Sequence, residues 1–153
     1  YDALWEQTPA PYITLAKTRQ HLNWRYRDYP TGVYRFFELT DPDTPDELWG
    51  WVAYTVIDDA VAVGDLHCDF GRDIDLLLYA FSACMRRQGH RAICLSYVGS
   101  EALERALRAA SFFPRDETPR PLFVRIGVEV DERQRRRLLL EPNWLVIEGD
   151  LDI

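Results

Sequence analysis

The segment with the most potential for chemistry is Asp65-Leu66-His67-Cys68-Asp69, at the end of a predicted strand. Side chains alternate along a strand, so Asp65, His67 and Asp69 share one face. An imidazole titrates near neutral pH, and His67 has the chemistry to remove a proton from an amine, with Asp65 on the same face. We therefore consider His67 and Asp65 candidate catalytic residues, and simple packing at the strand end is the alternative.

Two other chemistries fit this segment less well. A metal site is disfavoured because Asp65 and Asp69 lie ~13 Å apart in an extended strand and cannot share one ion. A Cys68 nucleophile lacks an evident base, because adjacent strand residues point apart. The three cysteines, Cys68, Cys84 and Cys94, show no zinc-ribbon or redox spacing, and we expect reduced thiols and no metal.

A second candidate site is the loop that precedes the clearest predicted helix, at residues 70–75. A helix N-terminus favours anions, Gly71 allows close backbone approach, and Arg72 could reach a phosphate. Asp73 and Asp75, however, bring carboxylates to the same place. A carboxylate ~4 Å from a phosphate costs about 1 kcal/mol in water and about 4 kcal/mol at an effective dielectric of 20. We therefore expect Asp73 or Asp75 to cap the helix in preference to a working phosphate site.

Hydrophobic periodicity predicts the elements that position these residues. Apolar side chains at positions 74, 77, 78, 81, 84 and 85 form one stripe of a helix over 73–88. Strands are expected over 33–39, 48–57 and 60–67, the last two joined by a tight turn at Asp58-Asp59, as an antiparallel meander.

The remaining segments complete the expected order. Thr18 and Ser100 are predicted N-caps of helices over 19–28 and 101–110. The other expected elements are helical turns over 2–9, strands over 92–97, 122–128 and 144–148, and either a helix or a charged loop over 131–140. A helix between the third and fourth strands makes that pair parallel. We predict an α/β domain over 1–153, with a mixed β-sheet flanked by helices on both faces.

Composition narrows the class of protein. Hydrophobic residues make up 47% of the chain, which is enough for a core and disfavours disorder. The net charge of −7 argues against a general nucleic-acid binder, which needs clustered cations. Lys17 is the only lysine, a bias that we attribute to base composition and give no functional weight. Neither a signal peptide nor a long apolar run is evident, so we expect a cytoplasmic protein with no membrane partner.

Short motifs at both ends of the sequence resemble one branch of the GNAT superfamily of acyl-CoA N-acyltransferases. Residues 22–26 (Leu-Asn-Trp-Arg-Tyr), with Tyr29-Pro30 and Tyr34, are similar to that branch's L-x-W-R-Y…P…Y. Gly50 stands where such proteins have a glycine at the start of the third strand. Trp144-Leu145 and the Gly-Asp-Leu-Asp of 149–152 are similar to its closing W-x-x-x-x-G-D-x-D. The expected order of elements is also the GNAT order, and the resemblance spans residues 1–153.

The resemblance implies a cofactor and partners. Acetyl-CoA or another acyl-CoA would be the donor, with Leu66, Gly71 and Arg72 as its contacts and a small-molecule or peptide amine as acceptor. In that branch this pattern forms the C-terminal half of a longer chain, whose first half carries the better cofactor loop. Because the sequence starts at Tyr1 and not at a methionine, we expect such a half, with a second GNAT-like half or a homodimer as partner.

The family's site residues are largely replaced in this sequence. The motif Gln/Arg-x-x-Gly-x-Gly/Ala aligns with residues 70–75, so that Asp73 and Asp75 stand at its glycines and Phe70 at its cation. The family's acid is a tyrosine one turn before Gly-Phe, where this sequence has Leu107 before Ser111-Phe112. No proton donor remains there, and Tyr97 would substitute only with an unusual geometry.

These departures leave three functions open. The first is an N-acyltransferase domain with a degenerate acyl-CoA loop that contributes substrate binding or packing. The second is catalysis by this domain itself, through Gly71, Arg72 and His67 or Asp65. The third is a non-catalytic GNAT-like binding or interaction module. The aromatic residues near the start of the chain are expected in the core or at a domain interface, in preference to a ligand cage: Trp24, Tyr26, Tyr29, Tyr34, Phe36, Trp49 and Trp51.

Overall fold

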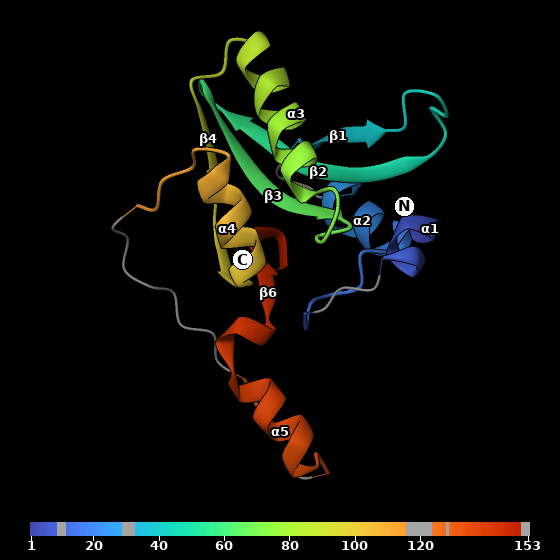
Figure 1. The fold of residues 1–153 in the computed structure, drawn as a ribbon, viewed down its shortest axis with the longest axis vertical. Helices are drawn as coiled ribbons and strands as arrows, with labels where there is room; N and C mark the ends of the chain where they lie inside the picture. The colour runs from blue at the N-terminus through green and yellow to red at the C-terminus, as the bar shows by residue number, and fades with distance from the viewer. Residues whose placement is uncertain (9–11, 29–32, 116–123, 128, 151–153) are drawn as a thin grey trace.

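The centre of the molecule is a mixed four-stranded sheet in the order β1-β2-β3-β4 (Figure 1). The computed structural model describes residues 1–8, 12–28, 33–115, 124–127 and 129–150. Strands β1 (Arg35–Thr40), β2 (Leu48–Ile57) and β3 (Ala60–Cys68) form the antiparallel meander, and β4 (Ala92–Leu95) runs parallel to β3. The predicted α/β class with a mixed sheet is confirmed.

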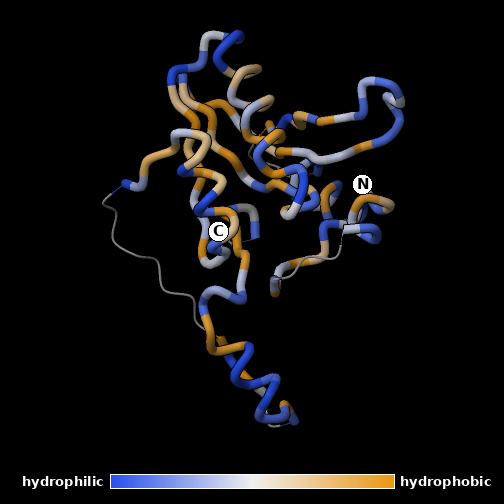
Figure 2. The backbone as a smooth tube through the Cα atoms, viewed as in Figure 1, coloured by the Kyte–Doolittle hydropathy of each residue, from blue (hydrophilic) through white to orange (hydrophobic). Residues whose placement is uncertain are grey.

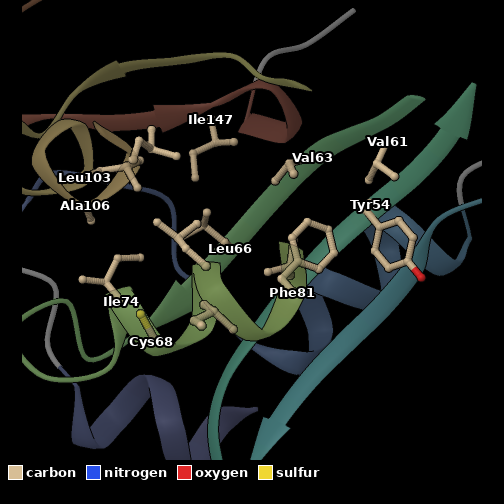
Figure 3. Packing of buried hydrophobic residues seen from close by; sticks show 14 of the residues in the cluster. Tyr54, Val61, Val63, Leu66, Cys68, Ile74, Phe81, Leu103, Ala106 and Ile147 are labelled. Atoms are coloured by element: carbon tan, nitrogen blue, oxygen red, sulfur yellow. The ribbon is translucent and has the colours of Figure 1, made fainter. Parts of the chain in front are cut away.

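One face of the sheet is covered by α3 (Ile74–Arg87) and α4 (Glu101–Ala109). The predicted apolar stripe of α3 packs on the sheet, with Leu77 and Phe81 almost fully buried. Figure 3 shows Phe81 beside Tyr54 and Val61 of the strands, and Leu103 of α4 beside Ile147. Burial of aliphatic and aromatic side chains at ~25 cal/mol per Å² is the main source of stability for this layer.

The other face is covered by the N-terminal helices α1 (Asp2–Gln7) and α2 (Arg19–Leu22) and the π-helix η1 (Asn23–Arg27). Their buried side chains pack on Trp51 and Ala53 of β2. Thr18 caps α2 as predicted, accepting a hydrogen bond from His21 N–H at 3.3 Å. The predicted helix over 19–28 is present in two parts, because Asp28 N–H donates to the carbonyl of Asn23, five residues earlier.

A β-bulge in β3 decides which side chains face which layer. Ala53 pairs with Asp65, whereas its neighbour Tyr54 pairs with Val63, so Gly64 is left without a partner on β2. Before the bulge Val63 faces the α3 layer, and after it Leu66 takes that face. The extra residue thereby turns Asp65 toward the N-terminal helices.

A second, two-stranded sheet continues from the first. The predicted strand over 92–97 is interrupted at Ser96, after which β5 (Tyr97–Gly99) pairs with β6 (Leu145–Ile147) and no longer follows β3. Ser100 caps α4 as predicted, accepting from Leu103 N–H at 3.2 Å. Ile13 forms a parallel bridge with Trp144, which ties the N-terminal segment to this second sheet.

The segment after α4 departs most from expectation. Of the predicted strand at 122–128, residues 124–127 form no strand, and 122, 123 and 128 lie outside the described residues. Residues 131–140 form α5 (Glu132–Leu139), which settles the choice between helix and loop; Asp131 and Gln134 make a capping box. Helix α5 buries no residue and is largely hydrophilic in Figure 2. The short 3-10 turns η2 (Glu141–Asn143) and η3 (Glu148–Asp150) flank β6.

No helix in the described part of the chain combines the length and the apolar character that crossing a bilayer requires.

Gly99 and Gly89 have similar backbone angles but different surroundings, so replacing each with alanine should change the free energy of unfolding by different amounts. Gly99 and Gly89 have φ of 82° and 87°, but a Cβ on Gly99 would lie 2.1 Å from the carbonyl oxygen of Trp144, whereas one on Gly89 meets nothing within 4 Å. Gly89→Ala should cost about 1–2 kcal/mol, the left-handed penalty alone. Gly99→Ala should cost at least ~3 kcal/mol, measured by urea unfolding, because backbone must also move. Equal losses would contradict this packing of Gly99.

Candidate functional site

The end of β3 that carries the predicted site residues contains a buried ion cluster. Lys17 Nζ lies 2.8 Å from Asp65 Oδ2 and donates a hydrogen bond to Asp150 Oδ1 at 2.6 Å. The side chains of Lys17, Asp65 and Asp150 are 2%, 0% and 4% exposed. The contact with Asp65 Oδ2 is a close ion pair without hydrogen-bond alignment, while Asp65 Oδ1 accepts from Leu66 N–H at 2.8 Å. One ammonium thus pairs with two carboxylates that come from distant parts of the sequence.

Burial and the neighbouring charges shift the pKa values of the groups in this cluster. Burial raises the pKa of Asp65 to about 6 against the opposing pull of Lys17, and Asp150 adds repulsion. Burial acts against the charged form of Lys17, but the two carboxylates together raise its pKa above the ordinary value. The Tyr26 hydroxyl lies 3.5 Å from the Gly64 carbonyl, and burial followed by the Asp65 charge raises its pKa. At neutral pH the cluster therefore holds a charged lysine and a protonated tyrosine.

His67 lies on the same face as Asp65 but is enclosed by the N-terminal segment. Its Nε2 is 2.9 Å from Thr8 Oγ1, and its ring packs 5.1 Å from that of Trp5. Only 3% of His67 is exposed, and burial, with the nearby Lys17 charge, lowers its pKa to about 4. A base for an amine works best with a pKa near the operating pH and needs contact with its substrate. In this arrangement His67 is a neutral, sealed imidazole.

The residues that alternate with Asp65 and His67 along β3, Leu66 and Cys68, point to the opposite face of the sheet, toward α3. Both are buried in the core beneath α3, as Figure 3 shows, with exposures of 2% and 1%. Burial, with repulsion from Asp73 and Asp69, raises the pKa of the Cys68 thiol well above its usual range. A thiol that stays protonated inside a core is a poor nucleophile. Leu66 contributes its side chain to packing.

The loop before α3 is closed by its own hydrogen bonds. Asp69 Oδ1 accepts from Gly71 N–H at 2.9 Å, and the Asp69 carbonyl accepts from Arg72 N–H at 3.1 Å and from Asp73 N–H at 2.7 Å. Arg72 donates to both carboxylate oxygens of Asp73, at distances of 2.9–3.1 Å. Asp73 stands at the N-cap position as predicted, but its carboxylate makes no capping hydrogen bond because it pairs with Arg72.

This loop does not fit the pyrophosphate of an acyl-CoA. Such a site needs backbone N–H groups that are free to donate, and a cation that is free to pair. Here three successive N–H groups donate to Asp69, and the Arg72 guanidinium already holds a carboxylate. Of the residues that the resemblance implied, Gly71 and Arg72 lie in this closed loop and Leu66 lies in the core.

The position of the family's acid is also filled by packing. Leu107 is buried between α4 and α3 with 6% exposure. Ser111, which stands where the proteins that the sequence resembles have a glycine, adopts a φ of 65°, a conformation that glycine takes without steric cost. Burial and the charge of Glu104 raise the pKa of Tyr97 on β5. Neither Leu107 nor Tyr97 therefore supplies an acid suited to neutral pH.

The structure brings together residues that the sequence did not connect. Asp65 and His67 share a face as predicted, but their partners Lys17, Asp150 and Thr8 were not foreseen. The available signal was that Lys17 is the single lysine among 18 basic residues, together with the Gly-Asp of the closing motif. The lysine ammonium is a compact cation with three donors, which suits a position between two buried carboxylates. Among the described residues, no group of three His, Cys, Asp or Glu side chains is placed to hold a metal ion.

Comparison of the chain with family models, with curated proteins and with solved structures gives no match.

Because the cluster contains two carboxylates and one ammonium, replacing Lys17 should destabilise the fold more than replacing Asp65. Lys17→Met should lower the free energy of unfolding by about 3–5 kcal/mol at pH 7, because it leaves two buried carboxylates without a cation. Asp65→Asn should cost less than about 1 kcal/mol, since it leaves the Lys17–Asp150 pair intact. Urea unfolding of both variants and of the double variant measures this, and the second substitution should recover part of the first loss. Equal costs for the two single variants would show that the cluster does not act this way.

The pKa values of Asp65 and His67 predict opposing pH dependences. Asp65, raised from 3.8 to about 6, makes the folded state less stable as pH rises from 4 to 6. His67, lowered from 6.5 to about 4, makes it more stable as pH rises over nearly the same interval. Relative to the unmodified protein, the unfolding free energy of Asp65→Asn should therefore rise by about 3 kcal/mol between pH 4 and 6, and that of His67→Gln should fall by a similar amount. Parallel curves for all three proteins would contradict these assignments.

Proposed function

We propose that this chain is a GNAT-like domain that contributes substrate binding or packing to an N-acyltransferase and does not itself hold the acyl-CoA. The observation that carries the proposal is the closed loop before α3, in which Asp69 accepts all three N–H groups of Gly71, Arg72 and Asp73. The mixed sheet and the helices on both faces support the GNAT-like part of the proposal.

The face beside the end of β3 supports the same proposal. In the family that the sequence resembles, a base on this strand would act next to the acyl-CoA. Here Lys17, Asp150, Thr8 and Trp5 occupy the surroundings of Asp65 and His67. A residue that is sealed from solvent contacts neither an acceptor nor a thioester, so His67 and Asp65 serve the fold in this domain.

A non-catalytic GNAT-like module is the second candidate function, and the same closed loop favours it. The two differ in whether the complete protein uses acyl-CoA at all. If the protein at its full natural length, together with any second GNAT-like half, neither binds nor consumes acetyl-CoA, the acyltransferase assignment fails and the binding module stands.

Titration calorimetry with acetyl-CoA tests the loop directly. The chain should show no saturable binding in the micromolar range, because donors and cation are already engaged. Asp73→Gly/Asp75→Gly, which restores glycine at both motif positions and frees Arg72, should bind at least about tenfold more tightly. Asp46→Gly, which removes an exposed carboxylate from the loop between β1 and β2, is the matched control and should change nothing. Micromolar binding by the unmodified chain would overturn the proposal and favour catalysis by this domain.

A further inference from the structure

A groove of about 500 Å³ lies on the face of the sheet opposite α3, between the N-terminal helices and β1. Residues of α2, η1 and β1, with Tyr1, line it, and their side chains fall into an aromatic set and a polar set. Its size is within the range of small-molecule sites. It shares no lining residue with the loop before α3.

The floor of the groove is apolar and firmly held. Leu22 and Tyr26 are 3% and 2% exposed, and the Tyr26 ring packs edge-on against Tyr34 and Phe36 at centroid distances of 4.9 Å and 6.0 Å. The Tyr26 hydroxyl points inward to the Gly64 carbonyl, so its ring is what faces the groove. Tyr1 closes the far side, with its ring 5.8 Å from Phe36. Such a surface is pre-organised for a flat or apolar group.

A polar row runs along the rim. Arg19, Asn23 and Arg27 are spaced four residues apart, which places them on one side of the helical segment beside the apolar row of Leu22 and Tyr26. The π-helix η1 includes both Asn23 and Arg27, so the row continues as far as Arg27. The rim therefore presents two guanidinium groups and one amide to whatever lies on the aromatic floor.

The two guanidinium groups have no carboxylate partner within the described residues. Elsewhere Arg72, Arg108 and Arg136 form ion pairs with neighbouring acids, as Arg108 does with Glu104. The acids beside the groove are engaged otherwise, since Tyr1 donates its hydroxyl proton to Glu38 and the backbone N–H of Arg19 donates to Asp2. The chain as a whole carries a net charge of −7, so a rim with two guanidinium groups differs in sign from the average of the chain.

We propose that this groove binds a small molecule that carries an oxyanion, a carboxylate or a phosphate, on an aromatic or apolar body. Arg19 and Arg27 hold the oxyanion through charge-assisted hydrogen bonds, and Tyr26, Tyr34 and Phe36 contact the body. A cationic ligand is disfavoured because the same rim repels it. The proposal goes beyond the proposed function and does not rest on it, because none of these residues belongs to the acyl-CoA loop.

Amide NMR titrations with four probes test this groove. We expect 3-phenylpropionate or phenyl phosphate to bind saturably in the millimolar range or better, with shifts centred on residues 22–27 and 33–36. The neutral 3-phenylpropanol and the cationic phenethylamine should bind at least about tenfold more weakly. Whichever anion binds more tightly identifies the oxyanion as carboxylate or phosphate.

Substitutions at the rim separate a built site from general charge attraction. Arg27→Gln and Arg19→Gln should each weaken the anionic probe about tenfold and leave the neutral probe unchanged. Arg133→Gln, at an exposed arginine of α5, removes the same charge far from the groove and should have no effect. The proposal is overturned if neither anion binds at millimolar concentration, if all four probes bind alike, or if Arg133→Gln weakens binding as much as Arg27→Gln.

Discussion

The buried ammonium of Lys17 is the interaction on which much of the fold depends. It joins the segment before α2 to the end of β3 and to the turn after β6, three regions that no single helix or strand connects. Asp150 also accepts from Ile147 N–H, so the same carboxylate fixes the end of β6. Removing charges from water is costly unless they are paired, so these segments must stay together whenever Lys17 is inside.

The bulge in β3 makes this cluster compatible with a continuous hydrophobic core. If Gly64 were paired regularly instead of forming a bulge, strict alternation would place Asp65 and His67 on the α3 side with Val61 and Val63. With it, one strand supplies apolar side chains to α3 along its whole length and polar ones to the N-terminal helices near its end. The two layers of the domain therefore differ in character. One is a purely apolar core, and the other combines aromatic packing with buried charge.

The features that the sequence predicted well are those that neighbouring residues determine. The strand over 48–57, the α3 stripe and the caps at Thr18 and Ser100 depend on spacings of two to four residues, and each is present. The bulge, the π-turn at Asn23 and the interruption at Ser96 result from tertiary packing, which overrides local preference. For the candidate site, the shared face of Asp65 and His67 was predictable. Their burial was not, because Lys17 and Asp150 lie 133 residues apart.

The polar groups of this chain also differ from region to region in how far they are satisfied within the chain. At the end of β3 and before α3, charges and donors find partners within the chain, so that Asp69, Arg72 and Asp73 satisfy one another. On the rim formed by α2 and η1, the guanidinium groups of Arg19 and Arg27 have no ion pair with another described residue, and they lie beside an aromatic floor. Polar groups that are hydrogen-bonded within the chain contribute to stability, whereas side-chain donors held in place beside a packed aromatic surface are suited to ligand binding.

The position of Asp150 has a consequence for how the chain acquires its structure during synthesis. A domain emerges from the ribosome N-terminus first, at roughly 5–20 residues per second. Lys17 and Asp65 are therefore available many seconds before Asp150, and until then the end of β3 lacks the hydrogen bond that Lys17 donates at 2.6 Å. The nascent chain should accordingly remain without the complete Lys17 cluster until residue 150 has left the exit tunnel.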